Sequence, residues 1–213
     1  MNSPPALRRG HFWSLTAYPW APSGGTERPI RWGWTLTRLI VLIMAALLIG
    51  GCSTGKDWRT ARRDSAGIAP DPNTTREAVL QVYGASAWGW RGWFAIHTWI
   101  AAKHTGESAY TVYEVVGWRL QRGQPAVRIE QDVPDRYWYG ERPRLLKGFR
   151  GNGVDELIAK VDTAARAYPW PMAYEAFPGP NSNTFTAWVA RQVPELALEL
   201  PFSAIGSGYV GGD

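Results

Sequence analysis

The fold is decided in the stretch from Pro178 to Arg191, which reads PGPNSNTFTAWVAR. Its two prolines and its glycine exclude a helix before Asn181, because proline lacks a backbone N–H and fixes φ. Beyond this point the apolar residues recur at helical spacing: Phe185, Trp188 and Val189. The stretch therefore predicts a helix that begins here, with Asn181 or Ser182 as its N-cap.

Two interpretations of Ser182 remain open at this point. In the first, the residue only belongs to a well-capped helix, since serine and asparagine start helices very often. In the second, the free N–H groups of the first helical turn activate Ser182 as a nucleophile and stabilise an oxyanion.

The rest of the body predicts an α+β fold, in which an antiparallel meander sheet comes first and helices follow. Alternating or continuous apolar patterns predict five strands, at residues 78–83, 93–103, 110–118, 126–130 and 145–150. Apolar residues at helical spacing predict a further helix over 154–168, closed by Pro169. We expect residues 76–213 to form a single domain.

The first 51 residues are typical of a leader. Residues 1–30 have no sustained period and predict disorder, and arginines then precede an apolar run at 39–51. A run of this length is typical of a signal-peptide core, and it ends just before Cys52, as in a bacterial lipoprotein that is cleaved and lipidated at the cysteine. The alternative is an uncleaved anchor over residues 32–51. Either way a polar tether at 52–75 would hold the body outside the cytoplasm, in the cell envelope and in the periplasm.

The composition excludes several classes of protein. The net charge is +5, but residues 52–213 carry 18 Lys/Arg against 17 Asp/Glu and no basic run. This near balance argues against nucleic-acid binding. With Cys52 as the only cysteine and three histidines, the chain predicts no disulfide, metal site or cofactor. The 13 tryptophans suit either a sheet core or a surface that stacks on carbohydrate.

A catalytic interpretation of Ser182 requires a base, and His97 is the one histidine inside a regular element of the body. A hairpin centred near Gly106 places Glu114 roughly opposite His97. In a triad, Ser182 would attack, His97 would take its proton, Glu114 would orient the imidazole, and Asn181 or Asn183 would assist. The alternative is a structural histidine, with Glu114 paired to an arginine such as Arg91 or Arg119.

Three segments resemble a bacterial envelope family known only as a domain of unknown function, the DUF3750 group. They are WGWRG at 88–92, HTWIA at 97–101 and GPNSNTF at 179–185. The resemblance runs from about Asp57 to Tyr209, and the family name implies no activity.

The segment at 181–185 also resembles, more distantly, the Asn-Cys-Asn-x-Phe segment of circularly permuted papain-like hydrolases of the NlpC and PPPDE kinds. That resemblance implies a permuted papain-like fold and a hydrolase of amide or ester bonds in peptidoglycan peptides or lipids. Those enzymes use cysteine where this chain has Ser182. The rival hypotheses are a non-catalytic binding module whose tryptophans grip glycan or a partner, and a structural lipoprotein with no ligand.

Overall fold

A computed structural model of the chain describes residues 57–211, which lie in one compact unit. The expected leader, the anchor at 32–51 and Cys52 lie outside the described residues. The structure has a five-stranded antiparallel sheet in the order β4-β3-β2-β1-β5. Its strands are β1 (Val79–Ser86), β2 (Ile96–Lys103), β3 (Thr111–Val115), β4 (Val127–Gln131) and β5 (Arg144–Arg150). The first four strands follow one another as a meander, and β5 pairs with the free edge of β1.

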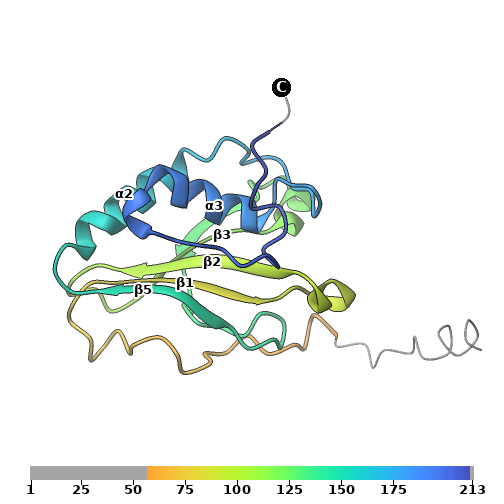
Figure 1. The fold of residues 1–213 in the computed structure, drawn as a ribbon. Helices are drawn as coiled ribbons and strands as arrows, with labels where there is room; N and C mark the ends of the chain where they lie inside the picture. The colour runs from red at the N-terminus through yellow and green to blue at the C-terminus, as the bar shows by residue number, and fades with distance from the viewer. Residues whose placement is uncertain (1–56, 212–213) are drawn as a thin grey trace, which may run out of the picture. The chain divides into compact units, whose positions relative to one another are not determined.

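Two helices cover one face of this sheet, α2 (Val154–Arg166) and α3 (Ser182–Gln192) (Figure 1). Their apolar sides pack on side chains that alternate along the strands, such as Ile100 of β2 and Val82 of β1. Phe185 of α3 is fully buried in this core, where its ring meets that of Tyr168 edge-on. We call this the helix face.

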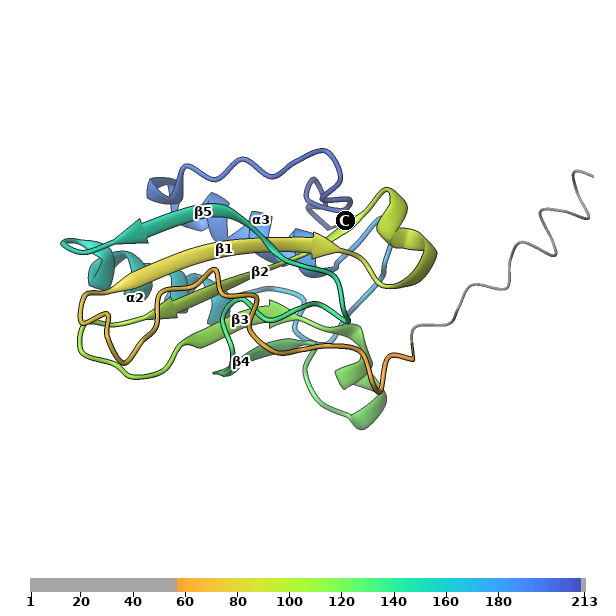
Figure 2. The same cartoon turned by 90° about the horizontal axis from the view of Figure 1, so that it is seen from below.

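The opposite face is covered by loops, and we call it the loop face. Its smaller core includes Trp99, Tyr83 and Val112. Residues 57–75, which belong to the polar tether predicted at 52–75, run across this face (Figures 1 and 2). The buried Asp135 holds them there by accepting hydrogen bonds from the backbone N–H groups of Ile68 and Ala69 and from the Ser65 hydroxyl. This part of the predicted tether therefore packs against the domain, because a carboxylate distant in sequence binds it.

Short 3₁₀ turns replace the predicted strands at one end of the sheet. Residues Gly89–Trp93 form η1 before β2, and Gly117–Arg122 form η2 after β3. Both strands are therefore shorter than the aromatic patterns at 93–103 and 110–118 indicated. A third turn, η3 (Pro194–Leu196), follows α3.

The structure confirms the predicted α+β class with an antiparallel sheet and packed helices. The circular permutation remains a prediction. In the part of the chain from 57 to 211, no helix combines the length and the apolar character needed to cross a bilayer.

Candidate functional site

Side-chain alternation along β2 decides the geometry of the candidate site. Thr98 points to the helix face, where its hydroxyl contacts the side chains of Asn183 and Thr186. His97 and Trp99 point to the loop face, where the two rings lie 5.8 Å apart. Successive residues of a strand face opposite sides of the sheet. His97 and the N-terminus of α3 are therefore separated by the sheet itself.

The polar residues at the start of α3 form a structural clamp. Asn181 is the N-cap, and its Oδ1 accepts hydrogen bonds from the N–H groups of Asn183 and Thr184 at 2.9 and 3.1 Å. The Thr184 hydroxyl in turn accepts from the Asn181 N–H, which completes a capping box. Gly206 approaches this cap so closely that a Cβ there would lie 2.3 Å from Asn181 Nδ2.

The amide groups of the clamp tie α3 to the rest of the domain. Asn181 Nδ2 donates to the carbonyls of Ala176 and Ile205, and Asn183 Nδ2 donates to those of Ile96 and Ile205. The hydrogen-bonding groups of both asparagines are thus used to join two loops and β2 to the helix. Of the two N-cap candidates in the sequence, Asn181 and Ser182, the structure has Asn181 as the cap.

Ser182 occupies the first position of α3 and is only 4% exposed. Its carbonyl lies near the hydroxyls of Thr98 and Thr186. Its own hydroxyl makes no hydrogen bond with any residue between 57 and 211, and it lines none of the cavities described there.

The structure does not bring the expected triad together. Ser182 lies on the helix face, whereas His97 and Glu114 lie on the loop face, and Asn181 and Asn183 remain with Ser182. The predicted hairpin of β2 and β3 does form, and it brings Glu114 close to His97. The register Ile100 to Tyr113, continued along the strands, places Glu114 opposite Trp99 and diagonal to His97.

His97 and Glu114 do meet, in a buried charge network. His97 Nε2 lies 3.4 Å from Glu114 Oε2. Glu114 also accepts hydrogen bonds at 2.6 Å from Arg128, its cross-strand partner on β4, and from Arg136 of the following loop. Glu114 therefore pairs with arginines, as the alternative reading expected, but with neither Arg91 nor Arg119.

These contacts fix the charge states of the pair. Burial alone would raise the pKa of Glu114, but Arg136, His97 and Arg128 together hold the pKa of this carboxyl far below 4.5. Burial lowers the pKa of His97 below 6.5, and this effect exceeds the opposing influence of Glu114. At neutral pH the imidazole is therefore neutral and the carboxylate is charged.

Arg136 itself is held tightly. Its guanidinium lies 5.6 Å from the Trp99 ring and 5.7 Å from the Trp138 ring. Its Nη1 is buried with no hydrogen-bond acceptor among the described residues, although Asp132 Oδ2 is 3.6 Å away. The network thus holds this cation at the cost of one unsatisfied donor.

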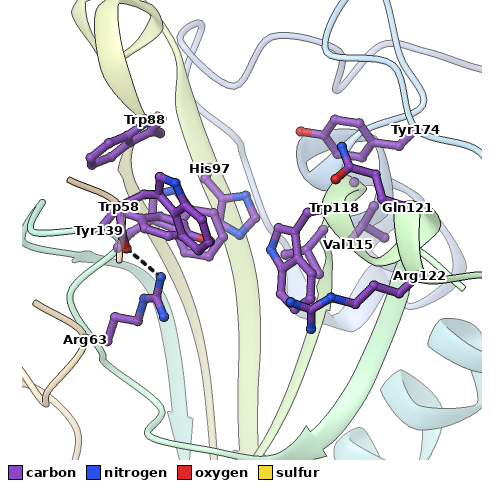
Figure 3. Close-up of a pocket in the computed structure, with 13 residues that line it drawn as sticks. Trp58, Arg63, Trp88, His97, Val115, Trp118, Gln121, Arg122, Tyr139 and Tyr174 are labelled. Atoms are coloured by element: carbon purple, nitrogen blue, oxygen red, sulfur yellow. Dashed lines mark hydrogen bonds between the residues drawn. The ribbon is translucent and has the colours of Figure 1, made fainter. Parts of the chain in front are cut away.

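His97 also lines a cleft of about 880 Å³ at the end of the sheet where η1 and η2 lie (Figure 3). Aromatic rings make up much of its wall, namely Trp58, Trp88, Trp118, Trp138, Tyr139 and Tyr174. The His97 ring stacks on Trp138, with ring centroids 3.5 Å apart and planes 5° from parallel. The imidazole is thus a polar element in a largely aromatic wall.

The charged groups of the cleft wall are arginines. Arg63 lies 4.6 Å from the Tyr139 ring and donates to the Trp58 carbonyl, and Arg122 lies 4.9 Å from the Trp118 ring. No Asp or Glu belongs to this wall among the described residues. Nor do any three His, Cys, Asp or Glu side chains between 57 and 211 gather to hold a metal ion.

A close backbone approach shapes the wall near Tyr174. A Cβ on Gly117 would lie 2.5 Å from the Tyr174 ring, so the ring can pack on η2 only because residue 117 is glycine. Burial raises the pKa of the Tyr174 hydroxyl, which therefore stays protonated at neutral pH.

Sequence reasoning missed the arginine partners and the composition of the cleft. Arg128 could have been found, because the meander places it on the strand next to Glu114. Arg136 and Trp138 come from a loop with no regular period, and nothing in the pattern linked them to His97.

Comparison with known families agrees with the resemblance found in the sequence. The model of a family described as a protein of unknown function, DUF3750, matches residues 77–209. No curated protein and no solved structure matches the chain. The matched region contains β1 to β5, both helices, the Asn181 clamp and the His97 network. The chain therefore belongs to the DUF3750 family.

Proposed function

We propose that this protein is a membrane-tethered module of the bacterial cell envelope that binds an anionic glycan without hydrolysing it. The observation that carries the proposal is the composition of the cleft, where aromatic rings surround His97 and the charged side chains are Arg63 and Arg122. A peptidoglycan fragment bearing a carboxylate is the ligand that best fits this chemistry.

The aromatic wall favours a sugar over an extended peptide. Flat rings offer an apolar face to the C–H groups of a pyranose while leaving its hydroxyls free for polar partners. Trp58 and Trp118 are 49% and 41% exposed, so both rings are accessible from solvent. The cleft volume lies within the range of small-ligand sites, about 300–1,000 Å³.

The two arginines favour a negatively charged sugar. A guanidinium binds a carboxylate with two parallel hydrogen bonds, and stacking on Tyr139 and Trp118 holds both groups before a ligand arrives. The neutral His97, oriented by Glu114, adds a polar contact for a hydroxyl or amide of the ligand.

The serine hydrolase predicted from the sequence has less support. Ser182 and His97 lie on opposite faces of the sheet, an arrangement that disfavours direct proton transfer between them. The membrane tether rests on the apolar run at 39–51 and on Cys52, as the sequence indicates.

The test uses the full chain in detergent and follows its tryptophan fluorescence. The probes are the disaccharide of N-acetylglucosamine and N-acetylmuramic acid, which bears a carboxylate, and the neutral disaccharide of N-acetylglucosamine. We expect the first to bind more tightly, and Trp118→Ala to weaken its binding about tenfold or more.

Two variants separate charge from stacking. Arg122→Gln should weaken binding of the acidic sugar about tenfold and leave binding of the neutral sugar unchanged. Trp90→Ala is the matched control, because this exposed ring lies outside the cleft wall. Equal affinity for both sugars, or no effect of Trp118→Ala, would refute the proposal, and so would release of a cleaved sugar.

A further inference from the structure

Five aromatic side chains on three loops of the domain are exposed to solvent. Phe202 is fully exposed and Trp93 is 93% exposed, and Phe177, Trp90 and Phe94 are all at least half exposed. None of these rings belongs to the cleft wall or to either core. So much exposed aromatic surface on one protein marks a site of interaction.

Hydrogen bonds place the three loops beside one another. The Ile96 N–H donates to the Ser203 carbonyl at 3.0 Å, which joins the segment containing Phe202 to the start of β2, two residues after Phe94. Asn181 Nδ2 lies within 3.2 Å of the carbonyls of Ala176 and Ile205, which joins the loop containing Phe177 to the same segment. The Trp90 and Phe94 rings are 5.5 Å apart. We call these five rings the aromatic end.

The other end of the sheet has a different surface. Residues 103–111 and 148–156 include no exposed large hydrophobic side chain. Polar pairs occupy it instead, such as His104 with Asp155 and Arg150 with Glu77. The exposed aromatic rings are therefore concentrated near one end of the domain.

We infer that the aromatic end docks on the surface of a lipid bilayer with anionic headgroups. Trp and Phe suit the boundary between acyl chains and headgroups, where an apolar ring can be buried without removing a charge from water. Arg91 lies among these rings, 5.9 Å from the Trp90 ring, and supplies a positive charge for the headgroups.

The path of the chain supports this orientation. The first described residues lie at the same end of the sheet as η1 and η2 (Figure 2). Asp57 follows Cys52 by five residues, which span at most about 18 Å when fully extended. An anchor at or before Cys52 therefore keeps this end close to the bilayer. The inference rests on the membrane tether of the proposed function and not on the glycan.

Docking in this way would also place the cleft beside the headgroups. Trp58 and Trp88 line the cleft, and Trp88 directly precedes η1. A glycan attached to a lipid would then reach the cleft without leaving the membrane surface.

The experiment uses the full chain reconstituted in vesicles of phosphatidylethanolamine and phosphatidylglycerol, with and without bromine near the headgroup end of the acyl chains. Bromine quenches tryptophan on contact. Trp93→Phe removes one emitter and keeps an aromatic ring in place, so the difference between the wild-type and variant emission reports Trp93 alone. Trp188→Phe is the matched control, because Trp188 of α3 is partly buried on the helix face and donates to the Ala164 carbonyl.

We expect brominated lipid to remove about half or more of the Trp93 emission and to leave the Trp188 emission unchanged. Unquenched Trp93 emission in chains that float with the vesicles would overturn the docking and leave the tether intact. If such emission also resisted acrylamide in water, a second copy of the chain would be covering the rings. Failure of the chain to float would instead refute the tether, and the docking with it.

Discussion

The two faces of the sheet show how one strand serves two different purposes. On the helix face, Thr98 and Ile100 of β2 lie beneath α3 and are buried from solvent. Phe185 and Val189 of that helix are also fully buried. On the loop face, His97 and its neighbours lie beneath irregular segments that leave a cleft open at one end. Regular helices bury a surface completely, whereas loops leave gaps in which polar groups can meet a ligand.

The difference also bears on the chemical hypothesis for Ser182. The polar cluster at the start of α3 resembles a catalytic motif, yet its amides and the Thr184 hydroxyl are engaged in holding the helix in place. The polar cluster around His97 has a cleft beside it. Four predictions test how much each cluster contributes to stability and whether the ligand binds beside the second.

The largest effect is expected from Glu114→Ala. Removing this carboxylate takes from the buried Arg136 its only hydrogen-bonded carboxylate among the described residues, which should lower the free energy of unfolding by about 3–5 kcal/mol. Urea denaturation of the full chain in detergent measures the change. The matched control is Glu195→Ala, which breaks the exposed pair with Lys160 and should have little effect. Equal losses in the two variants would show that the network is not buried as described.

The second effect concerns pH and His97. Its pKa is below 6.5 in the folded protein, so the unfolded chain binds this proton more readily as the pH falls. Stability should therefore decline as the pH falls below 6.5, with a slope of at most ~1.4 kcal/mol per pH unit from this one group. His97→Phe should flatten this part of the profile, measured by urea denaturation between pH 7.5 and about 5.5. If stability fell equally with pH in the wild type and in His97→Phe, the lowered pKa of His97 would be contradicted.

A smaller loss is expected from Asn181→Ala. The variant lacks the acceptor for the Asn183 and Thr184 N–H groups, and removing such a cap costs about 1 kcal/mol. Asn181→Ser should recover part of the loss, since its hydroxyl can accept one of these bonds. Thermal unfolding of the three proteins measures the order of their stabilities. A serine variant no more stable than the alanine variant would argue against the role of Asn181 as a cap.

The smallest effect is expected from Ser182→Ala. The hydroxyl makes no hydrogen bond with residues 57–211, so the free energy of unfolding should change by less than about 0.5 kcal/mol. Affinity for the acidic disaccharide should also stay the same, because Ser182 lies outside the cleft. A large loss of binding or of any hydrolytic activity would restore the serine as a functional residue.

Much of the fold could be predicted, because it depends on residues that are close together in the sequence. The strand patterns placed His97 and Glu114 on the same face, and Pro180 followed by Asn181 placed the start of α3. The side of the sheet that the helices cover could not be predicted. Both sets of alternating residues in β2 are apolar enough to form a core, so periodicity alone did not separate Ser182 from His97.

The sequence by itself determined the α+β class, the meander, the capped helix and the proximity of His97 and Glu114 on adjacent strands, because each follows from periodicity or from short-range chain geometry. Only the tertiary structure decided which face each polar cluster occupies, and which distant loop covers it. Asp135 binds residues 65–69, and Arg136 binds Glu114, through contacts that no local pattern encodes. The cleft exists because these long-range contacts place irregular segments, and not a helix, over His97.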